Sequence, residues 1–260
     1  MSTHPATAKS FHLRLNESIS QSLRILVIQI RSPDDPMKTQ EVECFQWALQ
    51  CTRDQFEIFD LTEGRRFSDV CLKRNDVVVI GGSGNYSVAA AGPWWDAAAD
   101  NMALLHDLSI PCFASCWGFQ AMARALGGVV VTDLARAEVG TVKVSMTPEA
   151  RHDPIFGVAP PVIRVQSGHQ DIVECLPEDA VCLASSDRVK HQAMMFPGKP
   201  IYGTQFHPEL SRQALVERLE AYPQYIDSVA GTTVQEFSAQ CRETPDAVEL
   251  LRRFIRVFCE

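Results

Sequence analysis

Short apolar runs that alternate with helical segments constrain the fold of this chain more than any other sequence feature. The segments "RILVIQI" (24–30), "NDVVVIGGSGNYS" (75–87) and "IPCFAS" (110–115) each contain a short apolar run, as strands buried on both faces do, and the second run stops in a glycine turn. Apolar residues at helical spacing follow the first two runs, and a further strand fits "FEIFDL". This alternation predicts an open, mostly parallel α/β sheet with helices on both faces. The remaining elements of this half are a strand over 56–61 and helices over 40–50, 93–109 and 117–126.

The second half of the chain has a different pattern. Its short apolar segments predict strands, some of them antiparallel, and its last fifty residues are helical in pattern. Thr244, Pro245 and an apolar stripe predict a helix over 244–258. We expect a single domain over 23–260 that follows a disordered tail over 1–22. The expected strands of this half cover 139–146, 161–166, 180–185, 192–196 and 200–205.

Composition excludes several classes of protein. The formal net charge of -8 over 260 residues argues against nucleic-acid binding, which needs a basic surface. No apolar run approaches the roughly 18 residues that cross a membrane, and the N-terminus lacks the apolar stretch of a secretory signal. The nine cysteines show no metal-ligand spacing. We therefore expect a cytoplasmic protein with reduced cysteines and without a metal site.

Cys116 occupies the position in this pattern that best suits a nucleophile. It follows the strand over 110–115 and precedes a helix, and side chains at such corners face outward on a tight turn. The partial positive charge at the helix N-terminus favours a thiolate there. Cys112 lies within the strand and is expected in the core. The alternative is that Cys116 is only a small structural residue at a strand-to-helix corner.

His207 is the candidate base, because it has the same place in the topology as Cys116. It follows the strand over 200–205 and precedes a helical segment, and Glu209 lies two residues further on. A carboxylate at that spacing can orient the imidazole and stabilise its charged form. Considered alone, His207 also fits a buried structural histidine, and Glu209 fits an acidic residue that complements the helix dipole.

Together the two motifs resemble a known family. "ASCWGFQAMARALGG" (114–128) and "GTQFHPE" (203–209), about ninety residues apart, are similar to the motifs of the triad, or class I, glutamine amidotransferases. Within them the chain resembles stand-alone members similar to the amidotransferase domain of GMP synthase. The resemblance implies a flavodoxin-like sheet with a small antiparallel sheet and C-terminal helices. It also implies that Cys116, His207 and Glu209 hydrolyse the side-chain amide of glutamine through a γ-glutamyl thioester.

The resemblance further implies an oxyanion hole made of two backbone N–H groups. These would belong to Trp117 and to the loop "GGSGN", in which Gly82 is the expected donor; without Cys116, this loop would read as an ordinary strand-ending turn. The chain departs from the family pattern at Ala114 and Ser83, where the family has glycine and proline. A methyl group at Ala114 should be tolerated if the backbone there is extended.

Substrate-binding residues are also implied by the resemblance. Gln120 matches a family glutamine that helps to bind the substrate, although it also fits a solvated helix residue. The segment "VQSGHQDIV" (165–173) matches a family segment that holds the amino and carboxylate groups of the substrate, and it places Gly168 and His169 there. Its Gly-His-Gln-Asp replaces the family's common Ser-His-Gly-Asp.

Three functions agree with these residues. The first is glutamine hydrolysis without a cofactor, with a separate synthase as the partner that uses the ammonia, since no ATP-binding motif is present. The second is hydrolysis of γ-glutamyl peptides such as glutathione, and the third is a non-catalytic binding module with the same fold. The absence of an acceptor domain favours glutamine over γ-glutamyl peptides as the substrate. The loop over 81–95 should border the leaving group, with Asn85 and Tyr86 as hydrogen-bond donors and Trp94 or Trp95 as an apolar wall or a packing residue.

Overall fold

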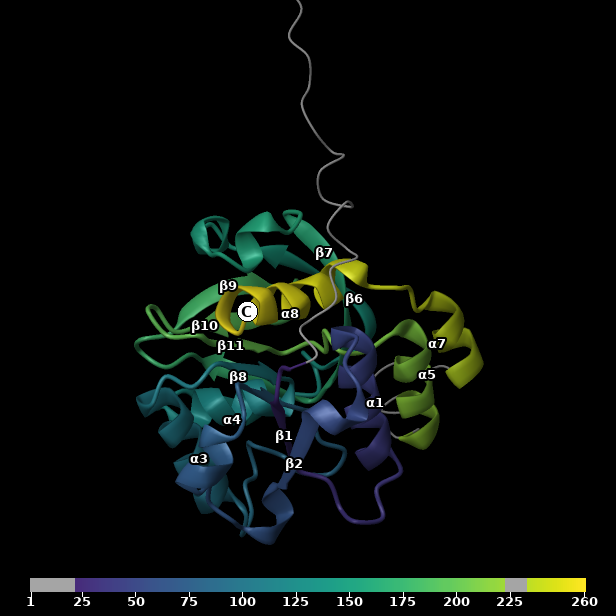
Figure 1. Cartoon of the computed structure of the whole chain (residues 1–260). Helices are drawn as coiled ribbons and strands as arrows, with labels where there is room; N and C mark the ends of the chain where they lie inside the picture. The colour runs from purple at the N-terminus through teal and green to yellow at the C-terminus, as the bar shows by residue number, and fades with distance from the viewer. Residues whose placement is uncertain (1–21, 223–232) are drawn as a thin grey trace, which may run out of the picture.

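A computed structural model describes residues 22–222 and 233–260 of the chain (Figure 1). The expected tail over 1–22 therefore lies, apart from Ser22, outside the described residues. The strands are β1 Ile25–Gln29, β2 Phe56–Asp60, β3 Val77–Ile80, β4 Cys112–Ser115, β5 Val129–Thr132, β6 Glu138–Met146, β7 Val162–His169, β8 Asp171–Cys175, β9 Val181–Ser185, β10 Ala193–Met195 and β11 Ile201–Thr204. The α-helices are α1 Met37–Leu49, α2 Asp69–Lys73, α3 Trp95–Asp107, α4 Trp117–Ala125, α5 Arg212–Ala221, α7 Val234–Gln240 and α8 Pro245–Phe258, and short 3₁₀ helices cover Arg53–Gln55, Leu61–Glu63, Glu149–His152 and Phe156–Val158.

Nine of these strands form one sheet, in the order β2-β1-β3-β4-β11-β10-β9-β6-β7. The pairs from β2 to β11 are parallel, and the pairs from β11 to β7 are antiparallel. β5 and β8 form a small antiparallel sheet of their own. The sequence-based expectation of a parallel sheet, antiparallel strands and C-terminal helices is confirmed.

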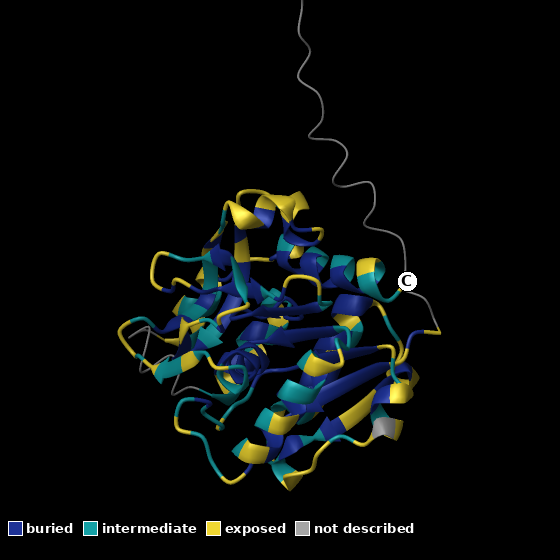
Figure 2. Cartoon of the chain, turned by 90° about the vertical axis from the view of Figure 1, so that its left-hand side faces the viewer, coloured by how far each residue is buried: buried dark blue, intermediate teal, exposed yellow. Residues whose placement is uncertain are grey.

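Two layers of helices bury the two faces of the parallel strands. Successive side chains of a strand point to opposite faces, so each strand contributes apolar side chains to both layers. Ile25 and Val27 of β1 pack in one core cluster with residues of α1 and α8, whereas Leu26 and Ile28 pack in another with α3 and α4. Figure 1 shows α8 across one face of the sheet and α3 and α4 on the other side. In Figure 2 the central strands are buried and exposure concentrates on outer helix faces and loops.

The structure differs from the predicted elements in a few places. α1 begins at Met37, directly after Pro36, rather than at residue 40, because proline is tolerated at the start of a helix. The five-residue helix α2 and the strands β5 and β8 were not predicted. α2 is too short to show a helical period, and β8 belongs to a segment interpreted only as substrate-binding.

Candidate active site

Three neighbouring parallel strands bring the candidate residues to one edge of the sheet. β3, β4 and β11 lie side by side, and all three end at this edge. Cys116 follows β4 at once, His207 follows β11 by three residues, and Gly82 follows β3 by two. Residues far apart in the sequence therefore meet where open α/β sheets place their ligands.

Cys116 sits on a strained turn that presents its sulfur. Its backbone has φ 50° and ψ -101°, a conformation that costs free energy in any residue with a Cβ atom. The next turn closes tightly, since a Cβ on Gly118 would lie 2.6 Å from a methyl carbon of Ile80. α4 begins at Trp117, so its N-terminal N–H groups and dipole lie beside the sulfur. By contrast, burial within β4 raises the pKa of Cys112, as expected for a core thiol.

His207 connects the sulfur to a buried carboxylate. Its Nδ1 lies 2.6 Å from Oε1 of Glu209, and its ring also interacts electrostatically with Cys116. Burial alone would lower the pKa of His207, but the charges of Glu209 and Cys116 outweigh it and raise this pKa to about 9. The buried carboxylate of Glu209 thus favours the charged form of the imidazole.

Glu209 is held ionised although it has no exposed surface. Burial would raise its pKa, but His207 and then Arg218 lower it below the ordinary value. Nη1 of Arg218, on α5, lies 3.9 Å from Oε1 of Glu209. Arg218 was not predicted from the sequence, because nothing in the pattern of a surface helix marks one arginine as facing a buried carboxylate.

Gln205 is a second residue that the sequence analysis missed, although it lies within the quoted "GTQFHPE" motif. Its Nε2 donates to Sγ of Cys116 at 3.8 Å, and its Oε1 accepts from Nε2 of Gln120 at 3.3 Å. Nε2 of Gln120 also donates to the backbone oxygen of Asp171 at 2.8 Å. Gln120 thereby fixes which end of the Gln205 amide faces the sulfur.

We expect substitutions of Gln205 to change the reactivity of Cys116 in a definite order. Gln205→Leu removes a donor that stabilises the thiolate, and Gln205→Glu replaces it with a negative charge. Alkylation of Cys116 by iodoacetamide at neutral pH should slow several-fold in Gln205→Leu and further in Gln205→Glu, while thermal unfolding verifies that both variants fold. Equal rates in all three proteins would show that the amide does not act on the sulfur.

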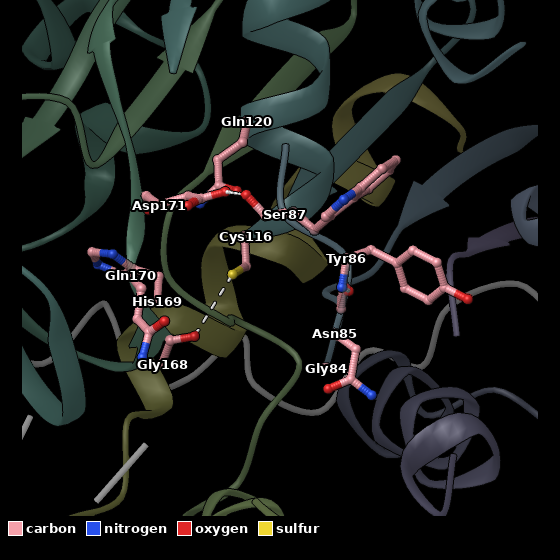
Figure 3. Close-up of a pocket in the computed structure, with 12 residues that line it drawn as sticks. Gly84, Asn85, Tyr86, Ser87, Cys116, Gln120, Gly168, His169, Gln170 and Asp171 are labelled. Atoms are coloured by element: carbon pink, nitrogen blue, oxygen red, sulfur yellow. Dashed lines mark hydrogen bonds between the residues drawn. The ribbon is translucent and has the colours of Figure 1, made fainter. Parts of the chain in front are cut away.

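A cavity of about 140 Å³ opens beside Cys116 (Figure 3). Gly168, His169 and Gln120 line it, and so do Asn85 and Tyr86. The lining residues are Ser83, Gly84, Asn85, Tyr86, Ser87, Cys116, Trp117, Gln120, Gly168, His169, Gln170 and Asp171.

The two tryptophans of the loop act in packing. Trp94 is buried, and its ring lies 5.5 Å from that of Trp117 and 5.9 Å from that of Tyr86, measured between centroids. Trp95 carries the guanidinium of Arg124 over its ring at 4.6 Å. Of the two roles expected for these residues, the structure supports packing.

The segment over 165–173 approaches the sulfur through its backbone. The carbonyl oxygen of Gly168 lies 4.0 Å from Sγ of Cys116. The ring of His169 is buried, with Nε2 3.3 Å from Oε2 of Glu138, and its Nδ1 has no hydrogen-bond partner among the described residues. Glu138, the carboxylate that contacts His169, is not one of the residues that line the cavity.

Gly82 departs from the arrangement expected of an oxyanion hole. Its N–H donates to Oε1 of Glu41 at 3.0 Å, so the expected donor has another acceptor in this structure. A Cβ on Gly82 would lie 2.7 Å from Cε1 of His207, which explains why glycine is needed there. Trp117 remains suitable, because the first N–H groups of a helix have no acceptor within it.

Two further kinds of feature are absent from the described residues. Among them, no group of three or more His, Cys, Asp or Glu side chains could hold a metal ion. In the same part of the chain, no helix is both long and apolar enough to cross a membrane.

Comparison with known families gives a match over most of this chain. A family model described as glutamine amidotransferase class-I matches residues 48–219. A glutamine-hydrolyzing GMP synthase subunit from Archaeoglobus fulgidus is 34% identical over 139 residues, which are 54% of this chain and 69% of the relative. The subunit of the same name from Methanopyrus kandleri is 34% identical over 125 residues, 47% of this chain and 65% of the relative. These alignments span about two thirds of the relatives' length.

Solved structures resemble the chain over nearly all of its length. A glutamine amidotransferase from Thermotoga maritima superposes with a TM-score of 0.72 at 20% identity, covering 92% of this chain and 98% of the other. A glutamine amidotransferase from Methylobacillus flagellatus gives a TM-score of 0.66 at 16% identity, covering 91% and 96%. At such identities the likeness establishes the fold.

Proposed function

Because the chain belongs to the class-I glutamine amidotransferase family, we propose that it hydrolyses the side-chain amide of glutamine, with Cys116 as nucleophile and His207 and Glu209 completing a triad. The observation that carries the proposal is the connected line of side chains at one sheet edge. Oε1 of Glu209 lies 2.6 Å from Nδ1 of His207, and Cys116 interacts electrostatically with the same ring. This is the arrangement in which a base activates a nucleophile and a carboxylate orients the base.

In the proposed reaction the thiolate of Cys116 attacks the amide carbon of glutamine, and negative charge develops on the amide oxygen. The N–H group of Trp117 would stabilise that charge, and the N–H group of Gly82 would do so once it has turned from Glu41. Such an effect is worth about 3–4 kcal/mol per donor in a well-studied protease. His207 donates a proton to the leaving ammonia, and a γ-glutamyl thioester forms. Water that gives a proton to His207 then attacks the thioester and releases glutamate, which restores the thiolate–imidazolium pair.

The ammonia formed in this way needs an acceptor. The relatives are named as subunits of a glutamine-hydrolyzing GMP synthase. We infer from this likeness that the chain supplies ammonia to a synthase partner.

Assays of the purified chain with glutamine and with glutathione test the proposal. We expect glutamate and ammonia from glutamine, with a kcat/KM higher than that for glutathione, and no product from either in Cys116→Ala. Strong cleavage of glutathione with negligible ammonia from glutamine would instead identify a γ-glutamyl peptide hydrolase. Covalent labelling of Cys116 without turnover would indicate dependence on a partner, and neither labelling nor turnover would favour a binding module.

The charge of Glu209 should set the alkaline limit of the reaction. His207 must be protonated to release ammonia, so activity is lost as the pH rises past the pKa of His207, which is about 9. Glu209→Gln removes the charge that contributes most to raising this pKa, and the alkaline limb of kcat/KM should move at least one pH unit lower. We expect a smaller loss of kcat at neutral pH than in a variant without the imidazole. If the alkaline limb of kcat/KM stays near pH 9 in Glu209→Gln, the charge of Glu209 does not set the pKa of His207.

A further inference from the structure

Glu41 is a fully buried carboxylate directly beside the glycine loop. It lies on α1 with no exposed surface, and its Oε1 accepts hydrogen bonds from the Gly82 N–H and from Nη2 of Arg31, both at 3.0 Å. Its Oε2 accepts from Nε2 of Gln29 at 3.0 Å. A buried charge persists only when it is paired and hydrogen-bonded, and these three donors meet that requirement.

The peptide between Gly81 and Gly82 has a defined direction. Its carbonyl oxygen accepts from the N–H of Gly118 at 3.2 Å, on the side of α4 and the nucleophile. All described peptide bonds are trans, so the Gly82 N–H points to the opposite side, where Glu41 lies. A Cβ on Gly81 would lie 2.4 Å from the carboxyl carbon of Glu41, so only glycine at this position allows the carboxylate to come so close.

Arg31 anchors Glu41 from behind. Its Nη1 contacts Oδ2 of Asp35 at 3.0 Å and the hydroxyl of Tyr222 at 3.2 Å. Burial works against the charge of Arg31, but Glu41 outweighs it and keeps the pKa of this guanidinium above its ordinary value. Tyr222, which follows α5, also packs over Gly84, where a Cβ would lie 2.5 Å from its hydroxyl. The carboxylate is thus held from several elements and cannot turn away freely.

We propose that Glu41 is a positioning residue that holds the Gly82 N–H turned away from Cys116, so that the oxyanion hole forms only when the Gly81–Gly82 peptide reorients. This inference rests on the proposed function, in which Gly82 is an oxyanion donor. Reorientation exchanges the charged acceptor Glu41 for the oxygen of the substrate, whose negative charge develops only during the reaction. Glu41 thereby keeps the hole incomplete in the resting protein.

Glu41→Gln tests the inference through kinetics. The amide still fits the site and can accept from Gly82, but without the negative charge it is a weaker acceptor. We expect kcat/KM for glutamine to rise about three- to tenfold. Alkylation of Cys116 by iodoacetamide, a displacement that builds no charge on a carbonyl oxygen, should keep its rate. The matched control is Glu43→Gln, the same change at an exposed position of α1, which should alter neither rate. An unchanged or lower kcat/KM in a folded Glu41→Gln variant would overturn the proposal.

A second measurement on the unmodified chain separates this inference from the proposed function and does not depend on the variant folding. In a ¹⁵N-labelled protein, the amide proton of Gly82 should resonate downfield, as expected for a bond to a carboxylate. After Cys116 has reacted with a diazo-ketone analogue of glutamine, that signal should shift as the N–H turns to the ketone oxygen. A Gly82 signal that is downfield and identical in the free and labelled protein would refute reorientation while leaving the triad intact. Failure of Cys116 to react would count against the proposed function alone.

Discussion

Cys116→Ala should abolish glutamine hydrolysis, with a loss on the order of 10⁴-fold or more, while the fold is retained. The sulfur is the atom that would form the thioester, and no neighbouring group replaces it: Gln205 is an amide, and the pKa of Cys112 is raised by burial in β4. The substitution removes only one atom from a turn that is otherwise fixed by the packing of Gly118 against Ile80. Ammonia release and thermal unfolding, measured on the same preparation, test both parts of the prediction.

Cys112→Ala is the matched control for this experiment. Both cysteines are buried, and they lie four residues apart at the two ends of the same short segment. Cys112→Ala removes an atom from the core, so it should lower thermal stability while leaving covalent labelling by a diazo-ketone analogue of glutamine intact. Peptide mapping that located the label on Cys112, or labelling that persisted in Cys116→Ala, would contradict the assignment.

The strand ends that carry this site could be predicted from the sequence, because their positions depend on the pattern of apolar residues. β3, β4 and β11 are short apolar runs followed by small or polar residues, and a parallel sheet brings such strand ends to one edge. The places of Cys116, His207 and Glu209 followed from that rule and from the two motifs. No knowledge of side-chain contacts was needed to predict these positions.

The charged residues behind the site could not be predicted in the same way. Glu41 and Arg218 lie on α1 and α5, where sequence periodicity would let either one face the solvent. Their burial depends on how those helices pack against the strand ends, which is a property of the tertiary structure. For the same reason the direction of the Gly82 N–H could not be foreseen, since a peptide can present either its oxygen or its N–H to the same neighbour.

His207→Ala should reduce kcat for glutamine by about 10³-fold, within the range that general acid–base catalysis contributes. The loss should depend on the leaving group. Ammonia requires a proton from His207, whereas the phenolate of a γ-aryl ester of glutamate leaves without one. We therefore expect the variant to release one equivalent of phenolate per Cys116 in a burst and then to turn over slowly, because hydrolysis of the thioester also needs the base.

Chemical rescue distinguishes this role from a structural one. The ring of His207 is buried between Glu209 and Cys116, and its removal leaves a space into which free imidazole can fit. Added imidazole should restore part of the hydrolysis of both substrates in His207→Ala, and it should have no effect on Cys116→Ala. If the variant folds but loses the amide and the ester reactions equally, shows no burst and does not respond to imidazole, then His207 acts only by maintaining the packing of the sheet edge. The 2.6 Å contact with Glu209 favours the catalytic outcome, because a buried carboxylate there holds the ring by Nδ1 and leaves Nε2 for the sulfur.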